Sequence, residues 1–406
     1  MYTLYGDGIH DDTAAIQELI DGSACELTLP CPQKYYLISA PLELPSNFKL
    51  ILPRFAEIRL APHSNCLMLK NKLQKDPAIS VKEGSGSWKA RFFAAYANAD
   101  PSRNIEITGG IWNCNNMEQN PNPFQSKDHS VPEFWGYGMY FYKVIGFKMS
   151  SLTIKDPTNF GATFGEVSYF TMEDITFDYN LGNPATINMD GLHFDGNCHF
   201  GTIRNLKGAC YDDLVALNAH EGTFGHITNI EIDGIFAEDC HSAVRLLTAE
   251  ETVENIHISN VYGTYYQYCI GLTNYYYLAD KKGLYRNITL DHIYASKAIR
   301  NPHYPWPKSY VFPLIWMDKM LRICNLKIRS LHRNEKNIPV PTICVRPQTE
   351  IDRLILEDIS TQTETEQPVP LLLCEGHIHH TILRDVFCES GEIFVGKENI
   401  DKTEIK

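Results

Sequence analysis

The sequence predicts an all-β fold of the β-solenoid type, in which short strands stack turn upon turn. From about residue 103 onward, the chain repeats a segment in which apolar and polar residues alternate. Successive segments are roughly 23–33 residues apart, and helical spacing is absent from them. In a solenoid, each turn buries its inward residues against its neighbours. A β-propeller ranks second, because its blades need about 40–50 residues each.

The repeat defines predicted columns of inward side chains. The last apolar residues of successive segments form one column: Leu152, Ile175, Leu206, Ile235, Val261, Ile293, Leu326, Ile359 and Val386. A second frame stacks four apolar pairs: Leu192 with Phe194, Leu214 with Ala216, Val244 with Leu246, and Ile270 with Leu272. This frame places Asp190 level with Asp212 and then with Ser242. Its outward column contains His193, Val215, Arg245 and Gly271.

A single β-helix domain is expected over residues 1–406, because solenoids grow by adding turns and so exceed the usual domain size. Residues 1–22 form a predicted N-terminal capping segment with a helix at 14–20. Asp11 or Asp12 is the expected N-cap of that helix. Three stretches depart from the repeat and are expected to be loop excursions, which often decorate the binding face: 71–103, 115–133 and 299–312.

The composition restricts compartment and partners. The chain has 44% hydrophobic residues and a formal net charge of −13, which predicts a large core and argues against nucleic acid or anionic membranes as main partners. The 12 cysteines show no metal-binding spacing. Cys210, Cys240 and Cys269 lie in apolar frames, so buried free thiols are expected there. No signal peptide is visible, which predicts a cytoplasmic protein, or a periplasmic or secreted one if a leader has been removed.

Three acidic residues in two short apolar frames are the candidate catalytic groups. Asp190 lies in the first frame, and Asp212 and Asp213 lie in the second, about one turn of the repeat later. A glycosidase needs a proton donor for the leaving oxygen and a second carboxylate. Crowded carboxylates repel one another, so at least one pKa should rise and hold a proton ready for donation. The alternative is that these residues form turns between strands, and strict alternation does require that Asp190 and Asp212 lie where a strand begins.

Several of these motifs resemble those of a known enzyme family. Residues 6–17, which begin Gly-Asp-Gly, resemble the opening motif of pectate-lyase-like right-handed β-helices, where it begins a capping helix. Residues 188–191, Asn-Met-Asp-Gly, and 212–216, Asp-Asp-Leu-Val-Ala, are similar to the catalytic region of the polygalacturonase family, glycoside hydrolase family 28. The resemblance implies a single-stranded right-handed parallel β-helix and an inverting hydrolase. In the roles it implies, Asp213 is the general acid, while the other two aspartates hold and deprotonate the attacking water.

The chain departs from that family in the segments that hold the substrate. The family's Gly-His-Gly segment is replaced by residues 239–242, in which Ser242 occupies the histidine column with His241 beside it. The family's Arg-Ile-Lys segment, which grips the substrate carboxylate, is similar to residues 245–247. This segment comes one turn early, however, and Leu247 replaces its Lys. The resemblance therefore implies that the linkage chemistry is kept while the sugar is changed.

The candidate substrate contacts are Asn188, His193, His241, Arg245 and Tyr268. Arg245 follows the acid pair by one turn and is either a substrate ligand or a surface salt-bridge residue. His193 either reaches the groove or is merely an exposed histidine. Tyr268 belongs to a dense tyrosine cluster at 262–277, in which some rings are expected to stack on sugars and others to lie in the core.

The predicted function is an inverting glycoside hydrolase that cuts an α-linked, pectin-like or otherwise acidic oligo- or polysaccharide. No cofactor and no metal is expected. Two alternatives remain open. A polysaccharide lyase on the same fold would need a Lys, Arg or Tyr base, often with Ca²⁺ at the acids. A non-catalytic phage-tail-like or carbohydrate-binding β-helix would bind without cleavage. The sequence does not predict an oligomeric state.

Overall fold

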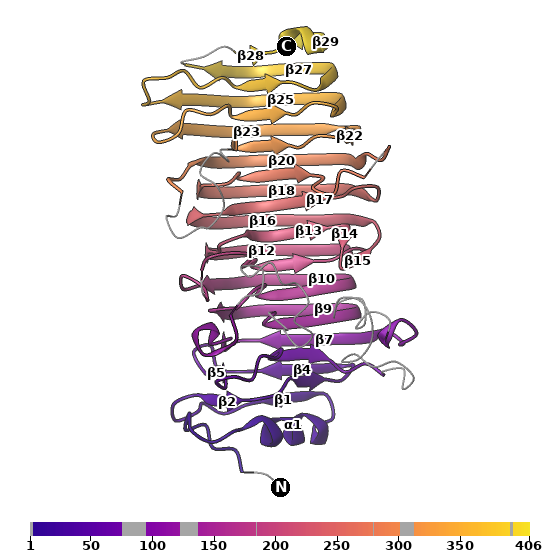
Figure 1. Ribbon diagram of the computed structural model, residues 1–406. Coiled ribbons are helices and arrows are strands. Elements are labelled where there is room, and N and C mark those ends of the chain that lie inside the picture. The colour runs from indigo at the N-terminus through magenta and orange to yellow at the C-terminus, as the bar shows by residue number, and fades with distance from the viewer. Residues whose placement is uncertain are drawn as a thin grey trace.

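Strands that are far apart in the sequence stack in parallel, one turn of chain above the next, and form a long solenoid with its termini at opposite ends (Figure 1). The architecture is the right-handed parallel β-helix that the sequence predicts. The computed structural model describes residues 3–74, 95–121, 137–183, 185–278, 280–300, 312–389 and 393–406. The three predicted excursions lie for their greater part outside these residues.

One stack of short strands carries the candidate site. In chain order it contains β3 (Leu42–Leu44), β6 (Leu69–Asn71), β11 (Leu192–Phe194), β13 (Asp213–Asn218), β17 (Ser242–Leu247), β19 (Ile270–Thr273), β21 (Ile315–Met317), β24 (Ile343–Val345), β26 (Leu372–Cys374) and β28 (Phe394–Val395). A small antiparallel hairpin leaves this stack after β13 and consists of β14 (His220–Glu221) and β15 (Thr223–Phe224).

The other sides of the solenoid are built from the remaining strands, several of which are much longer. They are β1 (Glu26–Thr28), β2 (Tyr36–Ile38), β4 (Phe48–Ile51), β5 (Glu57–Leu60), β7 (Ser102–Thr108), β8 (Ile111–Asn113), β12 (His199–Ala209), β16 (Ile227–Cys240), β18 (Thr252–Tyr265), β20 (Gly283–Lys297), β22 (Leu321–Ile323), β23 (Leu326–Glu335), β25 (Glu350–Thr363), β27 (His377–Cys388) and β29 (Ile400–Ile405). β9 (Met139–Lys155) and β10 (Ala162–Asp178) run through all sides.

Left-handed residues mark one corner of the solenoid. On successive turns the same position has a positive φ: Ser151, Asp174, Asn205, Gly234, Asn260, His292, Ser330, Asp358 and Asp385. Most of these are Gly, Asn or Asp, the residues that adopt this conformation at least cost. The corner therefore has a local chemical cause that recurs with the repeat.

The predicted inward column is confirmed over its first part and wrong at one member. Its residues lie in register from Leu152 to Ile293. The next member is Leu331 and not Leu326, which pairs one segment earlier. The spacing Leu-x-Ile-x-x-Leu occurs twice in succession, at 321–326 and at 326–331, so the apolar pattern fits either register. The left-handed Ser330 fixes the corner just before Leu331.

α1 (Thr13–Gly22) covers the N-terminal end and buries Ile16 and Ile20 (Figure 1). Asp12 occupies its N-cap position, but its carboxylate accepts backbone N–H groups of the preceding loop instead. Asp11 accepts the first N–H of the helix at 2.8 Å. Two 3₁₀ turns, η1 (Asn116–Glu118) and η3 (Lys397–Asn399), are further helical pieces of the described chain.

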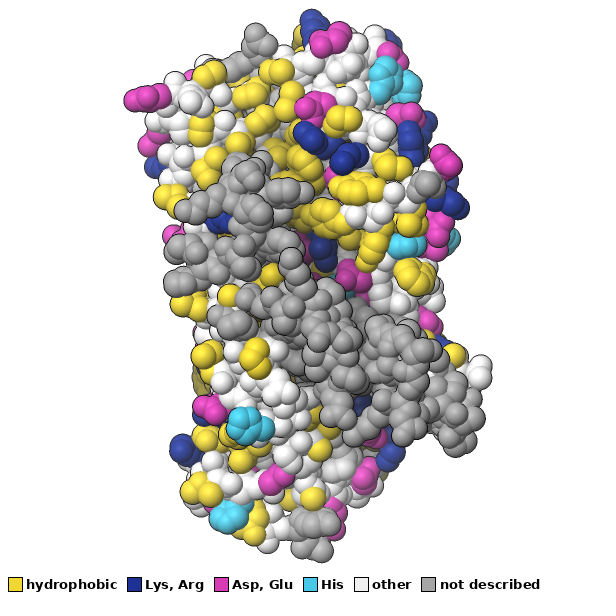
Figure 2. All heavy atoms as spheres, viewed as in Figure 1, with side chains coloured by type: hydrophobic (Ala, Val, Ile, Leu, Met, Phe, Trp, Pro, Cys, Tyr) yellow, Lys and Arg dark blue, Asp and Glu magenta, His cyan; other side chains and the backbone are white. Residues whose placement is uncertain are grey.

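The interior is a continuous apolar core that runs along the solenoid. Cys210, Cys240 and Cys269 are completely buried, as predicted. On the face shown in Figure 2, exposed hydrophobic side chains gather over the C-terminal half. Within the described ranges, no helix combines the length and the apolar character that a membrane crossing requires.

Candidate active site

The predicted acids come together where strands of the site-bearing stack begin. Asp213 is the first residue of β13, and Asp190 lies just before β11. The backbone N–H of Asp213 donates a 3.1 Å hydrogen bond to the Asp190 carboxylate. Asp212 directly precedes β13. Alternation of inward and outward side chains has not yet begun at these positions, which allows neighbouring acids to share one location.

The register of β11 on β13 differs by one residue from the prediction. Leu192 pairs with Val215, one position later than expected. Asp190 is therefore level with Asp213 and not with Asp212. The cause is that β13 is buried along its whole length, so apolar alternation could not choose between neighbouring residues. The outward column is His193, Ala216, Arg245 and Gly271.

His193 is held between two carboxylates. Its Nδ1 lies 2.6 Å from Asp190 Oδ2, and its Nε2 lies 3.3 Å from Asp195 Oδ1. The Phe160 ring stacks on it, with ring centroids 4.1 Å apart. Burial alone would lower the pKa of His193, but the hydrogen bonds to both carboxylates outweigh burial and raise the pKa to about 9. His193 is thus a buried imidazolium that fixes Asp190, with no exposed surface for a substrate.

Asp213 is completely buried and paired with a cation. Arg245 Nε lies 2.9 Å from its Oδ2, and the Ser242 hydroxyl donates to its Oδ1. The Tyr268 hydroxyl donates a longer bond, 3.5 Å, to the same Oδ1. Burial raises the pKa of Asp213 to about 6, although the charge of Arg245 opposes this rise. Above that pH, the cation and the donors stabilise an ionised carboxylate.

Asp212 has a different environment from its neighbour. Its side chain is 14% exposed, whereas that of Asp213 is 0% exposed. Burial and the negative charges of Asp190 and Asp213 raise the pKa of Asp212 well above its ordinary value. His241 Nδ1 lies 3.4 Å from Asp212 Oδ1, and burial and Arg245 lower the pKa of His241 well below its usual range. Since this imidazole is neutral, Asp212 is the carboxyl group best placed to keep a proton.

Arg245 is engaged within the protein. Besides its contact with Asp213, its Nη2 lies 3.7 Å from Glu221 Oε2, and its guanidinium lies 5.9 Å from the centre of the Tyr275 ring. Glu221 belongs to the β14–β15 hairpin and accepts a 2.8 Å hydrogen bond from Asn218. The segment that resembles a uronate grip therefore neutralises an acid of the site.

The other predicted substrate contacts differ in whether they lie around the acids. Tyr268 is only 1% exposed, and its hydroxyl lies 3.3 Å from that of Tyr275. His241 is likewise buried, beside Asp212. Asn188 is half-buried and left-handed, and it donates to Asn159 Oδ1 at 3.2 Å. The structure thus brings His193, His241, Arg245 and Tyr268 around the acids, while Asn188 is directed to a neighbouring loop residue.

Two groups of the cluster were not predicted: Asp195, which binds His193, and Glu221, which binds Arg245. Asp195 had a usable signal, because it lies two positions after His193 in a short polar–apolar run. Glu221 lies in a hairpin outside the repeat, so no periodicity pointed to it.

The ligand atoms of Asp212, Asp213 and His241 lie within 4.8 Å of one another, a spacing that could hold a metal ion. Arg245 already places a positive charge 2.9 Å from Asp213. Like charges repel strongly at such distances in a buried site, so a divalent cation fits poorly here. The arrangement is better suited to acid–base chemistry.

No protein-family model matches the chain, and no curated protein matches it in sequence. Its structure does resemble solved ones. Endo-xylogalacturonan hydrolase from Aspergillus tubingensis has a TM-score of 0.54 at 13% identity, covering 99% of this chain and 94% of that one. The exopolygalacturonase of Thermotoga maritima has a TM-score of 0.53 at 16% identity, covering 93% and 89%. The likeness shows a shared fold.

A third neighbour is a tailspike protein of E. coli bacteriophage HK620, described in complex with a pentasaccharide. It has a TM-score of 0.57 at 12% identity, covering 99% of this chain and 73% of the tailspike. The fold is therefore similar to that of a xylogalacturonan hydrolase, of an exopolygalacturonase and of a phage tailspike described with a bound pentasaccharide.

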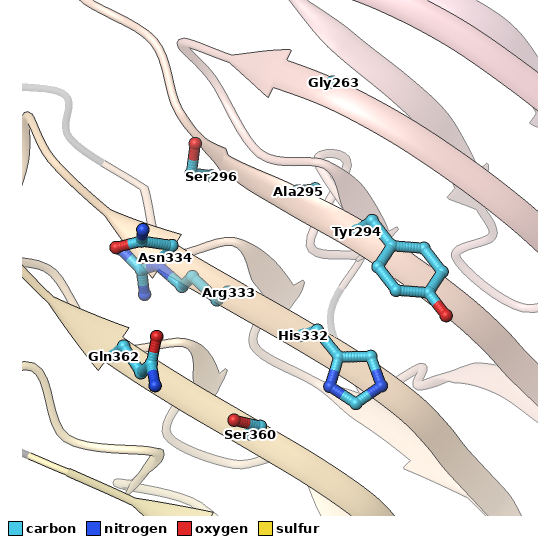
Figure 3. A pocket seen from close by; sticks show the side chains of 9 residues that line it. All are labelled: Gly263, Tyr294, Ala295, Ser296, His332, Arg333, Asn334, Ser360 and Gln362. Atoms are coloured by element: carbon cyan, nitrogen blue, oxygen red, sulfur yellow. The ribbon is translucent and has the colours of Figure 1, made fainter.

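Away from the acids, the outer surface carries a ladder of aromatic rings. Phe236, Tyr262, Tyr294 and His332 lie on successive turns, with stacked centroids 5.1, 5.1 and 5.2 Å apart. Tyr294 and His332 border a shallow depression of about 350 Å³, which Gln362 also lines (Figure 3). None of the three acids lines this depression. The aromatic ladder is therefore a surface feature separate from the acids.

Proposed function

We propose that the protein is a glycoside hydrolase that uses Asp190, Asp212 and Asp213. The observation that carries the proposal is the contrast between two adjacent carboxyl groups. Asp212 has a raised pKa and lies beside a neutral imidazole, whereas Asp213 is paired with Arg245. Environments that make the pKa values of two neighbouring carboxyl groups differ in this way are typical of a general acid and its partner. The fold shared with two pectin-cleaving hydrolases supports the proposal.

In the mechanism we propose, Asp212 donates its proton to the glycosidic oxygen as the bond to the anomeric carbon breaks. A water attacks that carbon from the opposite face and loses a proton to the Asp190–Asp213 pair. The sugar is released with its anomeric configuration inverted, as the family resemblance implies. This assignment exchanges the roles of Asp212 and Asp213 that the resemblance implied. The reason is that Arg245 stabilises the anion of Asp213 and so disfavours it as a donor.

The substrate class we propose is an α-linked acidic glycan of the pectin type. The neutral side chains of such glycans serve as comparison substrates. Arg245 is already bound to Asp213 and Glu221. A sugar carboxylate would have to compete with both of these acids for it. The comparison of homogalacturonan, xylogalacturonan, arabinan and galactan therefore tests whether this cation takes part in recognition.

The decisive variant is Asp212→Asn. It should lower turnover on the cleaved glycan by roughly 10²–10⁴-fold, the usual contribution of a general acid. Asp233→Asn is the matched control, because Asp233 lies on the outer surface, where it accepts hydrogen bonds from Ser259 and Asn260. Undiminished turnover in Asp212→Asn would reject the proposal.

The exchange of roles has its own test. Aryl glycosides with good leaving groups need little protonation, so Asp212→Asn should recover activity on them, whereas Asp213→Asn should not. Recovery in Asp213→Asn alone would restore the roles that the resemblance implied.

A lyase is less well supported by the same residues. Burial and the charge of Asp213 raise the pKa of Tyr268 well above its ordinary value, so its phenol is a poor base. An unsaturated product with ultraviolet absorbance would nevertheless identify a lyase. Binding of the glycan without any cleavage would identify a carbohydrate-binding β-helix.

A further inference from the structure

A second cluster of potential metal ligands lies near the C-terminal end of the solenoid. His377 and His379 belong to β27, and Asp401 belongs to β29. One ligand atom from each residue lies within 4.8 Å of the other two. The cluster is separate from the acids on β13, since these strands belong to the last turns of the chain (Figure 1).

The strands themselves create this geometry. His377 and His379 are two positions apart, so their side chains leave β27 on the same side. The register of β27 on β29 places His379 beside Asp401. As a result, His377 Nε2 lies 3.1 Å and His379 Nδ1 lies 2.9 Å from the same oxygen, Asp401 Oδ2. The three donors are held by hydrogen-bonded backbone and not by a loop.

We propose that His377, His379 and Asp401 bind a divalent transition metal of the Zn²⁺ type. Zn²⁺ takes imidazole nitrogens at about 2.0–2.1 Å and carboxylate oxygens at about 2.0–2.2 Å in tetrahedral sites. Two such donors are then about 3.3 Å apart, close to the spacing seen here. Imidazole together with carboxylate favours Zn²⁺, Ni²⁺ or Cu²⁺ over Ca²⁺, which prefers an all-oxygen shell.

The charge and exposure of the cluster also suit a cation. The three side chains are 40%, 46% and 53% exposed, so an ion can enter, and a water can complete the coordination. No cation is bound to Asp401 among the described residues, whereas Arg245 occupies the acid cluster on β13. Zn²⁺ would therefore meet less electrostatic opposition here than at the acids.

Such an ion would fasten the last strand to the solenoid. A metal that bridges β27 and β29 adds a link across this end. Bound Zn²⁺ is expected to slow amide hydrogen exchange in residues 400–405 without changing exchange in β13.

The test is calorimetric titration of zinc chloride into the full-length, chelator-treated protein. The wild type should bind one Zn²⁺ with a dissociation constant in the micromolar range. His377→Ala or His379→Ala should weaken binding at least tenfold. His380→Ala is the matched control: it removes a histidine of the same strand whose Nε2 lies 3.2 Å from Glu404 on β29, and it should leave affinity within about twofold.

Three results would overturn the proposal. One is the absence of saturable binding at Zn²⁺ concentrations up to about 1 mM. Another is unchanged affinity in the double variant His377→Ala/His379→Ala. The third is loss of the bound ion in Asp212→Asn with retention in His379→Ala, which would place the metal at the acids on β13.

Discussion

At the scale of single residues, the site depends on the different environments that the fold gives to residues adjacent in sequence. Asp212 and Asp213 are adjacent, yet one is partly exposed beside a neutral imidazole and the other is buried against a guanidinium. The difference arises because Asp213 begins a strand, while Asp212 still belongs to the preceding turn. One residue of chain thus separates a carboxyl group suited to hold a proton from one suited to lose it.

This contrast predicts the pH dependence of activity. The burial-raised pKa of Asp213, about 6, means that its carboxylate form is lost as the pH falls through 6. The value of kcat/KM should therefore rise with pH through an acidic limb near 6 and fall again where Asp212 loses its proton. The measurement is kcat/KM on the best glycan between pH 4 and 9. An acidic limb near pH 4 would show that Asp213 need not be ionised.

His193 makes a second prediction, on stability. Its pKa is raised to about 9 in the folded state by the bonds to Asp190 and Asp195. The resulting stabilisation is complete below the unfolded value of about 6.5 and is lost as the pH rises through 9. His193→Ala should lower the free energy of unfolding by about 3–5 kcal/mol at pH 6, because two buried carboxylates lose their counter-ion.

Denaturant titration at pH 6 and at pH 10 checks this. The cost of His193→Ala should shrink at pH 10, where the wild type has also lost the proton. A cost that does not change with pH would mean that Phe160 packing, and not charge, explains the effect.

At the scale of elements, the aromatic ladder stabilises successive turns. Tyr262 stacks on Phe236 and on Tyr294, with centroids 5.1 Å apart on both sides. Within the described ranges, Tyr169, on an earlier turn, stacks on Phe200 alone, also at 5.1 Å. An aromatic pair contributes about 0.5–1.5 kcal/mol beyond burial. Tyr262→Ala should therefore destabilise the protein more than Tyr169→Ala, both because of its second stacking partner and because its ring is less exposed, 37% against 62%.

Urea unfolding followed by circular dichroism measures both variants. Equal losses would mean that neither the second stacking contact nor the greater burial of Tyr262 contributes to stability. A larger loss in Tyr169→Ala would contradict the stacking argument directly.

Much of the element structure could be predicted from alternation alone, and its failures have one cause. The inward column from Leu152 to Ile293 follows from apolar spacing. The register error at Leu214 occurs in a run of consecutive apolar positions, and the error at Leu326 occurs where the same apolar spacing repeats five residues later. At both places more than one register buries only apolar side chains, so the sequence pattern does not choose between them. The left-handed residue at the corner, Ser330, resolves the first error, but Ser is not a reliable mark of that conformation.

The site was predictable only in part for a related reason. The acids lie within the repeat and so could be brought together by counting turns. Asp195, which contacts His193, could have been found from its place two positions after that residue, whereas Glu221, which contacts Arg245, could not, because it lies in a hairpin outside the repeat. The pairing of Arg245 with Asp213 also depends on side-chain direction at a strand start, where alternation gives no guidance.

At the scale of the whole molecule, each turn contacts only its neighbouring turns. A destabilising substitution should therefore act mainly on the turns around it. Ile58 on β5 and Ile378 on β27 are both completely buried, near opposite ends. Ile58→Ala and Ile378→Ala should each lower local stability by about 2–5 kcal/mol. Native-state hydrogen exchange should speed up near the altered turn and stay unchanged in β13 and β17. Uniform acceleration along the chain would indicate a single cooperative unit instead.

The candidate site draws its parts from successive turns: His193 from one, Asp213 from the next, Arg245 from the third and Tyr268 from the connection that leads into the fourth. No turn outside this group supplies a charged partner to the acids among the described residues. Evolution could therefore lengthen or shorten the chain at either end, by gain or loss of whole turns, while inheriting the chemistry unaltered.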